Sequence, residues 1–260
     1  MTMASYDRPA SFRIGRVFGD TFSVLGRNLG LCIGLAAIFS GIPTFLFQLW
    51  TQSQVAAALA PEAGAAFGWS SVTSGIGGIL VYFIFGSLLQ AALVRATIED
   101  LNGQQPSFAD SLNRAIAVLL PVIGLSLVVG IGIGLASMLL LVPGIILFLR
   151  WAVAVPVLVQ ERLGVNDSLS RSANLTKGNR WALLGFFVIL YVALIVLQMV
   201  LELAAGAVIP LVGDVIGAAL LALASTISTM VASIASAVSY VELRYVKEGT
   251  DVKELAEIFA

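Results

Sequence analysis

The sequence contains no histidine, a single cysteine and few charges. Of its 260 residues, 14 are lysine or arginine and 15 are aspartate or glutamate, which makes 11% of the chain charged. Without histidine the chain lacks the commonest general acid–base group and the commonest metal ligand. The lone Cys32 excludes an intrachain disulfide and a cysteine-based metal site. We therefore expect no metal site and no cofactor, and the net charge of −1 favours no nucleic-acid partner.

Apolar residues, by contrast, are abundant. They make up 59% of the chain, and the mean hydropathy is +1.00. Soluble domains are about 45–50% apolar and about 25% charged. A water-soluble globule would have no place to bury so much apolar surface. The composition therefore excludes a soluble enzyme, a disulfide scaffold and a disordered regulator, and it predicts an all-α integral membrane protein.

Six apolar runs are long enough to cross a bilayer as helices, which takes about 20 residues. Two of them come from one stretch, residues 115–160, that carries Arg150 as its only charge. The tripeptide Val142-Pro143-Gly144 interrupts this stretch, and we expect two helices to meet there because proline cannot continue a helix and glycine permits a turn. The other four predicted spans are residues 29–50, 72–94, 181–201 and 215–241.

The basic residues predict how the spans are oriented. Of the 14 lysines and arginines, 13 lie in the segments that would face one side of the membrane, and the fourteenth is Arg150. The positive-inside rule then places both termini in the cytoplasm. The predicted organisation is a cytoplasmic N-terminus with an amphipathic interfacial helix (1–28), a six-helix transmembrane domain (29–246) and a short cytoplasmic tail (247–260). The expected location is a bacterial inner membrane.

A short amphipathic segment precedes each of the three outward-going spans. These segments cover residues 12–25, 106–114 and 166–172. The strings DSLNR (110–114) and DSLSR (167–171) nearly coincide, and Asp20-Thr21-Phe22 is a looser third copy. The pattern predicts three repeats, each made of an interfacial amphipathic helix and a helical hairpin. The alternative is that any helix entering a membrane can carry a cap and a few charges.

Three charges within or near the predicted spans form a candidate site. Arg150 lies inside the fourth span, while Glu202 and Asp214 lie near the outer ends of the fifth and sixth spans. An intramembrane arginine is costly and usually faces a partner or water. One interpretation is a site for an anionic headgroup or solute lined by Arg150. The other is a structural ion pair that joins the fourth and fifth spans.

Small and polar residues suggest how the spans pack. The string Gly130-x-Gly132-x-Gly134 favours close helix packing over a phosphate loop. The sixth span is rich in alanine and serine, which places it at the bundle interior or at an oligomer face, with a serine-lined pore as the alternative. Gln90 and Gln198 could bridge helices.

The block from Pro143 to Asn179 resembles the membrane-domain family of glycerophosphoryl diester phosphodiesterase. The positions that follow the family pattern are Pro143, Gly144, Arg150, Pro156, Glu161, Arg171, Lys177 and Gly178. The resemblance implies a six-span inner-membrane domain. Some family members carry a soluble phosphodiesterase domain that uses histidines and a metal. This sequence has no histidine, so we do not expect that activity.

Four functional hypotheses remain. The leading one is a non-enzymatic scaffold or accessory protein in lipid or envelope homeostasis. The others are a transporter or flippase of a lipid or amphiphile with Arg150 at its site, a channel, and an intramembrane enzyme that would need Glu202 and Asp214 to converge. The expected partners are membrane lipids and either another membrane protein or a second copy of the chain.

Overall fold

A computed structural model describes residues 11–59 and 69–249, and every element in these two ranges is a helix. The all-helical class predicted from composition is therefore confirmed. The helices are α1 (Ile14–Arg27), α2 (Leu29–Ala36), the π-helical turn η1 (Ala37–Gly41), α3 (Ile42–Leu59), α4 (Trp69–Leu101), α5 (Phe108–Ala117), α6 (Leu119–Leu139), α7 (Leu141–Trp151), α8 (Ala154–Glu161), α9 (Val165–Thr176), α10 (Arg180–Val212) and α11 (Asp214–Glu248).

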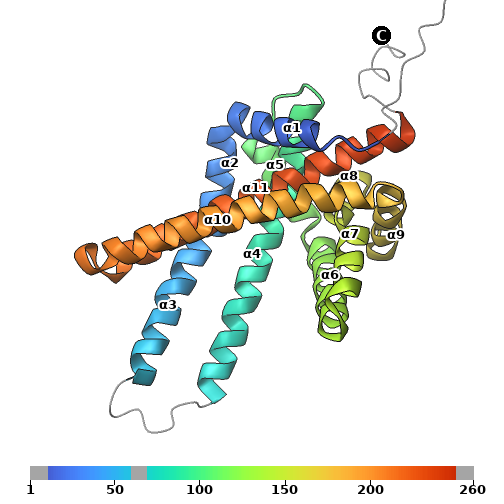
Figure 1. Ribbon diagram of the computed structural model, residues 1–260. Coiled ribbons are helices and arrows are strands. Elements are labelled where there is room, and N and C mark those ends of the chain that lie inside the picture. Colours follow the sequence, from blue (N-terminus) through green and yellow to red (C-terminus); the bar gives the residue numbers. More distant parts are fainter. Residues whose placement is uncertain (1–10, 60–68, 250–260) are drawn as a thin grey trace, which may run out of the picture.

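The long helices form three hairpins that diverge from a common hub (Figure 1). The hairpins are α2–α3 with α4, α6 with α7, and α10 with α11. The short helices α1, α5 and α9 precede them in turn and lie at the hub together with α8 and the C-terminal ends of α4 and α11. Helices therefore occur in all three segments predicted to be amphipathic.

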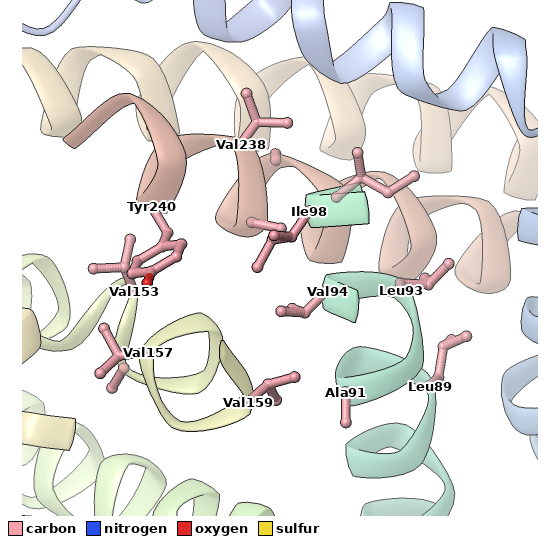
Figure 2. Close-up of a cluster of buried hydrophobic side chains, with 14 of the residues drawn as sticks. Leu89, Ala91, Leu93, Val94, Ile98, Val153, Val157, Val159, Val238 and Tyr240 are labelled. Carbon is pink, nitrogen blue, oxygen red and sulfur yellow. The ribbon is translucent and has the colours of Figure 1, made fainter. Parts of the chain in front are cut away.

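The hub is closely packed, whereas the hairpin tips are not. Its core joins Leu89 and Val94 of α4, Val157 of α8 and Tyr240 of α11, all of which are buried (Figure 2). At the tip of the second hairpin Met138 is 86% exposed. Side chains this apolar need a covering other than water. Exposed apolar side chains also run along the hairpins, at Leu120, Ile131 and Val196, as is typical of surfaces that face a membrane.

Five stretches of the described residues are long and apolar enough to cross a membrane. They are 29–54 (α2, η1 and α3), 119–139 (α6), 141–161 (α7 and α8), 180–207 (α10) and 215–248 (α11). The protein is therefore a membrane protein with several spanning helices. The remaining predicted span, residues 72–94, lies within the 33-residue helix α4, which is not among these five, so six spans remains a prediction.

The expected boundary between the third and fourth spans needs correction. The turn of this hairpin lies at Leu140, which is extended, and not at residues 142–144. Pro143 is the third residue of α7, and a proline in the first helical turn sacrifices no helical hydrogen bond. Pro143 therefore lies within the start of the helix. The expected single helix over 145–160 is also broken, at Ala152–Val153, between α7 and α8.

Glycine allows close packing within each hairpin. A Cβ atom added at Gly132 of α6 would lie 2.6 Å from the ring of Trp151 on α7. The close packing predicted for the Gly130–Gly134 string is thus confirmed at Gly132, whereas a Cβ at Gly130 or Gly134 would meet open space. The other hairpins repeat the arrangement, with Gly78 beneath Phe47 and Gly217 beneath Ile209.

The first amphipathic helix, α1, has one buried face, and Ile14, Phe18 and Leu25 pack partly buried against the same core. Its buried residues are Val17, Thr21 and Val24, whereas Phe22 is 54% exposed. The face packs against α4, α10 and α11 at the hub. Ser107 is the N-cap residue of α5, but its side chain makes no capping hydrogen bond.

Candidate functional site

Arg150 and Glu202, two of the three charges singled out by the sequence, do not form an ion pair. Arg150 is exposed on the last turn of α7, and among the ion pairs of residues 11–59 and 69–249 none involves it. Glu202 is exposed on α10, where it accepts a hydrogen bond from Gln198 Nε2 at 3.0 Å. Asp214 begins α11, and its side chain lies outside the described part of the structure. The structural ion pair between Arg150 and Glu202 is therefore not formed.

The break between α7 and α8 is the most unusual backbone feature near Arg150. In a continuous helix, the N–H of residue 156 would donate to the carbonyl of Ala152, but Pro156 has no N–H. The carbonyl of Ala152 instead accepts a hydrogen bond from Ser236 Oγ of α11 at 3.0 Å. The carbonyl of Arg150 accepts one from Ser172 Oγ of α9, also at 3.0 Å. Two serines from other helices thus satisfy the backbone at the break.

A hollow of about 410 Å³ opens beside this break. It lies among α4, α6, α7, α8, α10 and α11, and Phe148 and Trp151 of α7 form part of its wall, whereas Arg150 does not. Its size is in the range typical of small-ligand sites. The polar residues that line it are Gln90, Ser126, Tyr191, Thr229, Ser233 and Ser236.

A second hollow of about 440 Å³ continues the first along α10 and α11. The two share Tyr191, Thr229 and Ala232 as lining residues. The second ends at a chain of polar groups, in which Ser228 Oγ donates to Gln198 Oε1 at 3.3 Å and Gln198 Nε2 donates to Glu202. We refer to the two hollows together as the groove.

The hydroxyls of α11 leave the groove rich in acceptors. Thr229 donates to the carbonyl of Ser225 at 2.9 Å, and Ser233 donates to the carbonyl of Thr229 at 2.8 Å. A hydroxyl that donates its proton within its own helix still has lone pairs that accept hydrogen bonds. The groove thus combines apolar walls with a line of acceptors on α11.

Family-pattern positions Glu161 and Arg171 belong to a ring of polar contacts at the hub. Arg171 Nε donates to Glu161 Oε2 at 2.9 Å, and its Nη2 contacts Glu248. Arg244 Nε donates to Glu248 Oε2 at 3.1 Å, and Tyr240 Oη donates to Glu161 Oε1 at 2.9 Å. Burial would lower the pKa of Arg171, but the hydrogen bonds that it donates to Glu248 and Glu161 outweigh this effect and raise the pKa above its usual value. The ring joins α8, α9 and α11.

Packing and backbone conformation favour glycine at two other family-pattern positions, Gly144 and Gly178. Gly178 has φ +90° in the turn between α9 and α10, a conformation that favours glycine. Lys177 beside it is exposed. Gly144 lies directly against Ser137 of α6, so the second hairpin has no room for a side chain there. Within the described residues, no three Cys, Asp or Glu side chains come together as metal ligands.

Sequence reasoning anticipated some of the groove and missed the rest. Gln198 bridges α10 and α11 through Ser228, as predicted. Gln90 of α4, also predicted to bridge helices, lines the groove. Thr229 and Ser233 were not predicted as groove residues. Their spacing of four residues, continued from Ser225, places their hydroxyls on one face of a helix, and this spacing could have identified them.

The fold and the groove define an all-helical membrane protein with several spanning helices and a partly polar groove between its hairpins. Residues 125–247, just under half of the chain, match the family model for the membrane domain of glycerophosphoryl diester phosphodiesterase. The match extends from within α6 into α11 and confirms the resemblance expected from Pro143 to Asn179. No curated protein and no solved structure matches the chain.

Proposed function

We propose that this protein is a non-enzymatic, multi-pass inner-membrane protein that binds a lipid or similar amphiphile in the groove and serves as an accessory or scaffold in lipid or envelope homeostasis. The observation that carries the proposal is the groove itself. Its walls include Phe148, Trp151 and Phe187, which suit acyl chains, and its α11 face offers hydroxyls. A mixture of apolar walls with a few polar groups is typical of ligand sites.

The hub supports the predicted three-repeat organisation. Thr21, Ser111 and Ser168 occupy equivalent positions in the three repeated strings, and each is fully buried, with 0% exposure. A small residue at this position lets each amphipathic helix approach its neighbours closely. We accordingly interpret the chain as three units, each an amphipathic helix followed by a hairpin, joined at a hub on the cytoplasmic side.

Helix α4 is the sixth span in this arrangement. Its 33 residues give a length of about 50 Å at 1.5 Å per residue, which exceeds the roughly 30 Å hydrocarbon core. With six spans, both termini lie on the same side. The basic residues place that side in the cytoplasm.

Lipid retention by the purified protein tests the proposal. Gly130 lines the groove, and a Cβ there would meet open space, so Gly130→Leu places an apolar side chain at the wall of the groove. Gly134→Leu is a matched control, because Gly134 is open too and does not line the groove. Native mass spectrometry should show lipid bound to the wild type and to Gly134→Leu but not to Gly130→Leu. Equal retention by all three proteins, or no bound lipid in the wild type, would contradict the proposal.

A second candidate is a flippase, favoured by the discontinuous α7–α8 segment and the π-helical turn η1. Broken spans are typical of transporter sites, and π-helical turns occur frequently at functional sites. The test is movement of labelled lipid between leaflets of vesicles that contain the purified protein. Movement that Gly130→Leu abolishes and Gly134→Leu retains would support the flippase. Vesicles with the wild type that show no movement above protein-free vesicles would reject it.

A further inference from the structure

We infer that the groove selects an amphiphile with an ammonium headgroup, which Glu202 binds at the outer end of the groove. This inference rests on the proposed function and names the class of lipid. It differs from the anionic ligand that Arg150 suggested, because Arg150 does not line either hollow.

The position of Glu202 suits a headgroup. Glu202 lies 22 residues beyond Arg180, the first residue of α10, which corresponds to about 33 Å along the helix. That distance is close to the thickness of the hydrocarbon core, so Glu202 lies at the opposite boundary from the hub. A headgroup at this level stays at the membrane surface while its chains enter the groove.

The charge of the groove selects the sign of the headgroup. Among the described residues that line the two hollows, Glu202 is the one acidic residue, and none is lysine or arginine. A carboxylate with no cation beside it repels a phosphate that carries the only charge of a lipid, and it attracts an ammonium group. The hydrogen bond from Gln198 to Oε1 fixes the carboxylate and leaves further lone pairs of its two oxygens available as acceptors.

The remainder of the groove accommodates the apolar part of the ligand. From Glu202 back to Phe187, the groove follows 15 residues of α10, which is about 22 Å. This length exceeds one leaflet of a hydrocarbon core that is about 30 Å thick. Leu194, Ile195 and Met199 line the part next to Glu202, so an acyl chain would lie on an apolar surface immediately below the headgroup.

The experiment compares three lipids with identical acyl chains on the full-length protein by native mass spectrometry. Phosphatidylethanolamine has a primary ammonium that donates hydrogen bonds, phosphatidylcholine has a quaternary ammonium that donates none, and phosphatidylglycerol has no ammonium. We expect the wild type to prefer phosphatidylethanolamine over phosphatidylglycerol by about tenfold, the size of one charge-assisted hydrogen bond, with phosphatidylcholine in between. Glu202→Gln keeps the shape of the side chain and should bind all three lipids equally.

The outcomes separate this inference from the proposed function. A wild type that binds the three lipids equally, or a Glu202→Gln variant that keeps the preference, would overturn the headgroup assignment and leave lipid binding in the groove intact. A wild type that binds none of the lipids would overturn both. Excess free ethanolamine should not displace the bound lipid, because the chains contribute to binding. Displacement would instead identify a site for small soluble amines and contradict the lipid assignment.

Discussion

At the scale of single residues, the break between α7 and α8 shows how one proline requires a partner on a distant helix. Pro156 cannot donate to the carbonyl of Ala152, and Ser236 of α11 supplies the missing donor. A buried carbonyl without a donor costs about 1–3 kcal/mol. The polar groups at this break are therefore part of how the second hairpin is attached to α11.

Ser236→Ala should lower the free energy of unfolding by about 1–3 kcal/mol, because it leaves the Ala152 carbonyl without a donor. Ser239→Ala is the control, since Ser239 is also buried but donates only within α11, to Ala235. Its effect should be smaller. The measurement is equilibrium unfolding in detergent micelles.

A double-mutant cycle gives the sharper result. Pro156→Ala restores an N–H that reaches the Ala152 carbonyl, so Ser236→Ala should cost less in that background. If Ser236→Ala lowered the free energy of unfolding equally with and without Pro156, the hydroxyl would stabilise the protein through a contact other than its hydrogen bond to the Ala152 carbonyl.

Gly144→Ala should destabilise the protein by about 1–3 kcal/mol, the usual cost of overpacking. Its Cβ would lie 2.9 Å from the Cβ and 3.0 Å from the Cα of Ser137, and a backbone atom cannot move aside cheaply. Gly134→Ala, which meets open space, should not destabilise the fold. Thermal unfolding of the two variants under the same conditions checks this, and a loss of stability in Gly134→Ala alone would contradict it.

Residue-level prediction from the sequence was weakest for the charges. Arg150 was prominent because it is the only charge in a long apolar stretch, but hydropathy does not indicate which face of a helix points outward. In the structure the neighbours of Arg150, Phe148 and Trp151, line the groove, and Arg150 itself is exposed. Glu202 was identified from its position at the end of a span, and it does line the groove.

At the scale of elements, ion pairs join the short helices α1 and α9 to their neighbours at the hub. Arg16 and Arg27 of α1 pair with Glu242 of α11 and Asp100 of α4. Arg171 of α9 joins Glu161 of α8 to Glu248 of α11. These ion pairs attach α1 and α9 to the hairpin ends, and the location of the amphipathic helices in the membrane interface stays a prediction.

Arg171→Gln should destabilise the protein by about 1.5–3 kcal/mol, the value for hydrogen bonds to charged groups, because two half-buried carboxylates lose their shared partner. Arg27→Gln is the matched control. Its side chain is 55% exposed, and exposed ion pairs contribute about 1 kcal/mol or less. Chemical unfolding in detergent would compare the two variants. An equal or larger loss of unfolding free energy in Arg27→Gln would show that the ring of polar contacts stabilises the hub no more than the exposed ion pair does.

The sequence predicts where helices occur far better than where they bend. Hydropathy located the long apolar stretches, and the repeated strings located α1, α5 and α9. The turn at Leu140 and the break after Trp151 were both misjudged. Each depends on whether a proline starts a helix or interrupts one, and that is decided by partners such as Ser236, 80 residues beyond Pro156 in sequence.

At the scale of the whole molecule, three hairpins diverge from one packed hub and expose apolar side chains, with α11 at the centre. Ala218, Ala222 and Ser239 of α11 are buried, as expected for a span at the bundle interior. A membrane protein can be predicted from composition alone, because that inference needs no knowledge of residue contacts. The groove could not be predicted in the same way, since its lining comes from six helices whose relative positions depend on the hub.

The orientation of the hairpins gives the last prediction. In a background where the buried Cys32 is replaced by alanine, single cysteines at exposed positions report which side of the membrane they face. Ser53→Cys and Leu140→Cys, near the tips of the first two hairpins, should react with a membrane-impermeant maleimide on intact cells, because six spans place the tips outside. Gln104→Cys and Asn166→Cys, at the hub, should react only after permeabilisation. If Gln104→Cys and Ser53→Cys reacted from the same side, α4 would not cross the membrane, and the chain would have five spans with its termini on opposite sides.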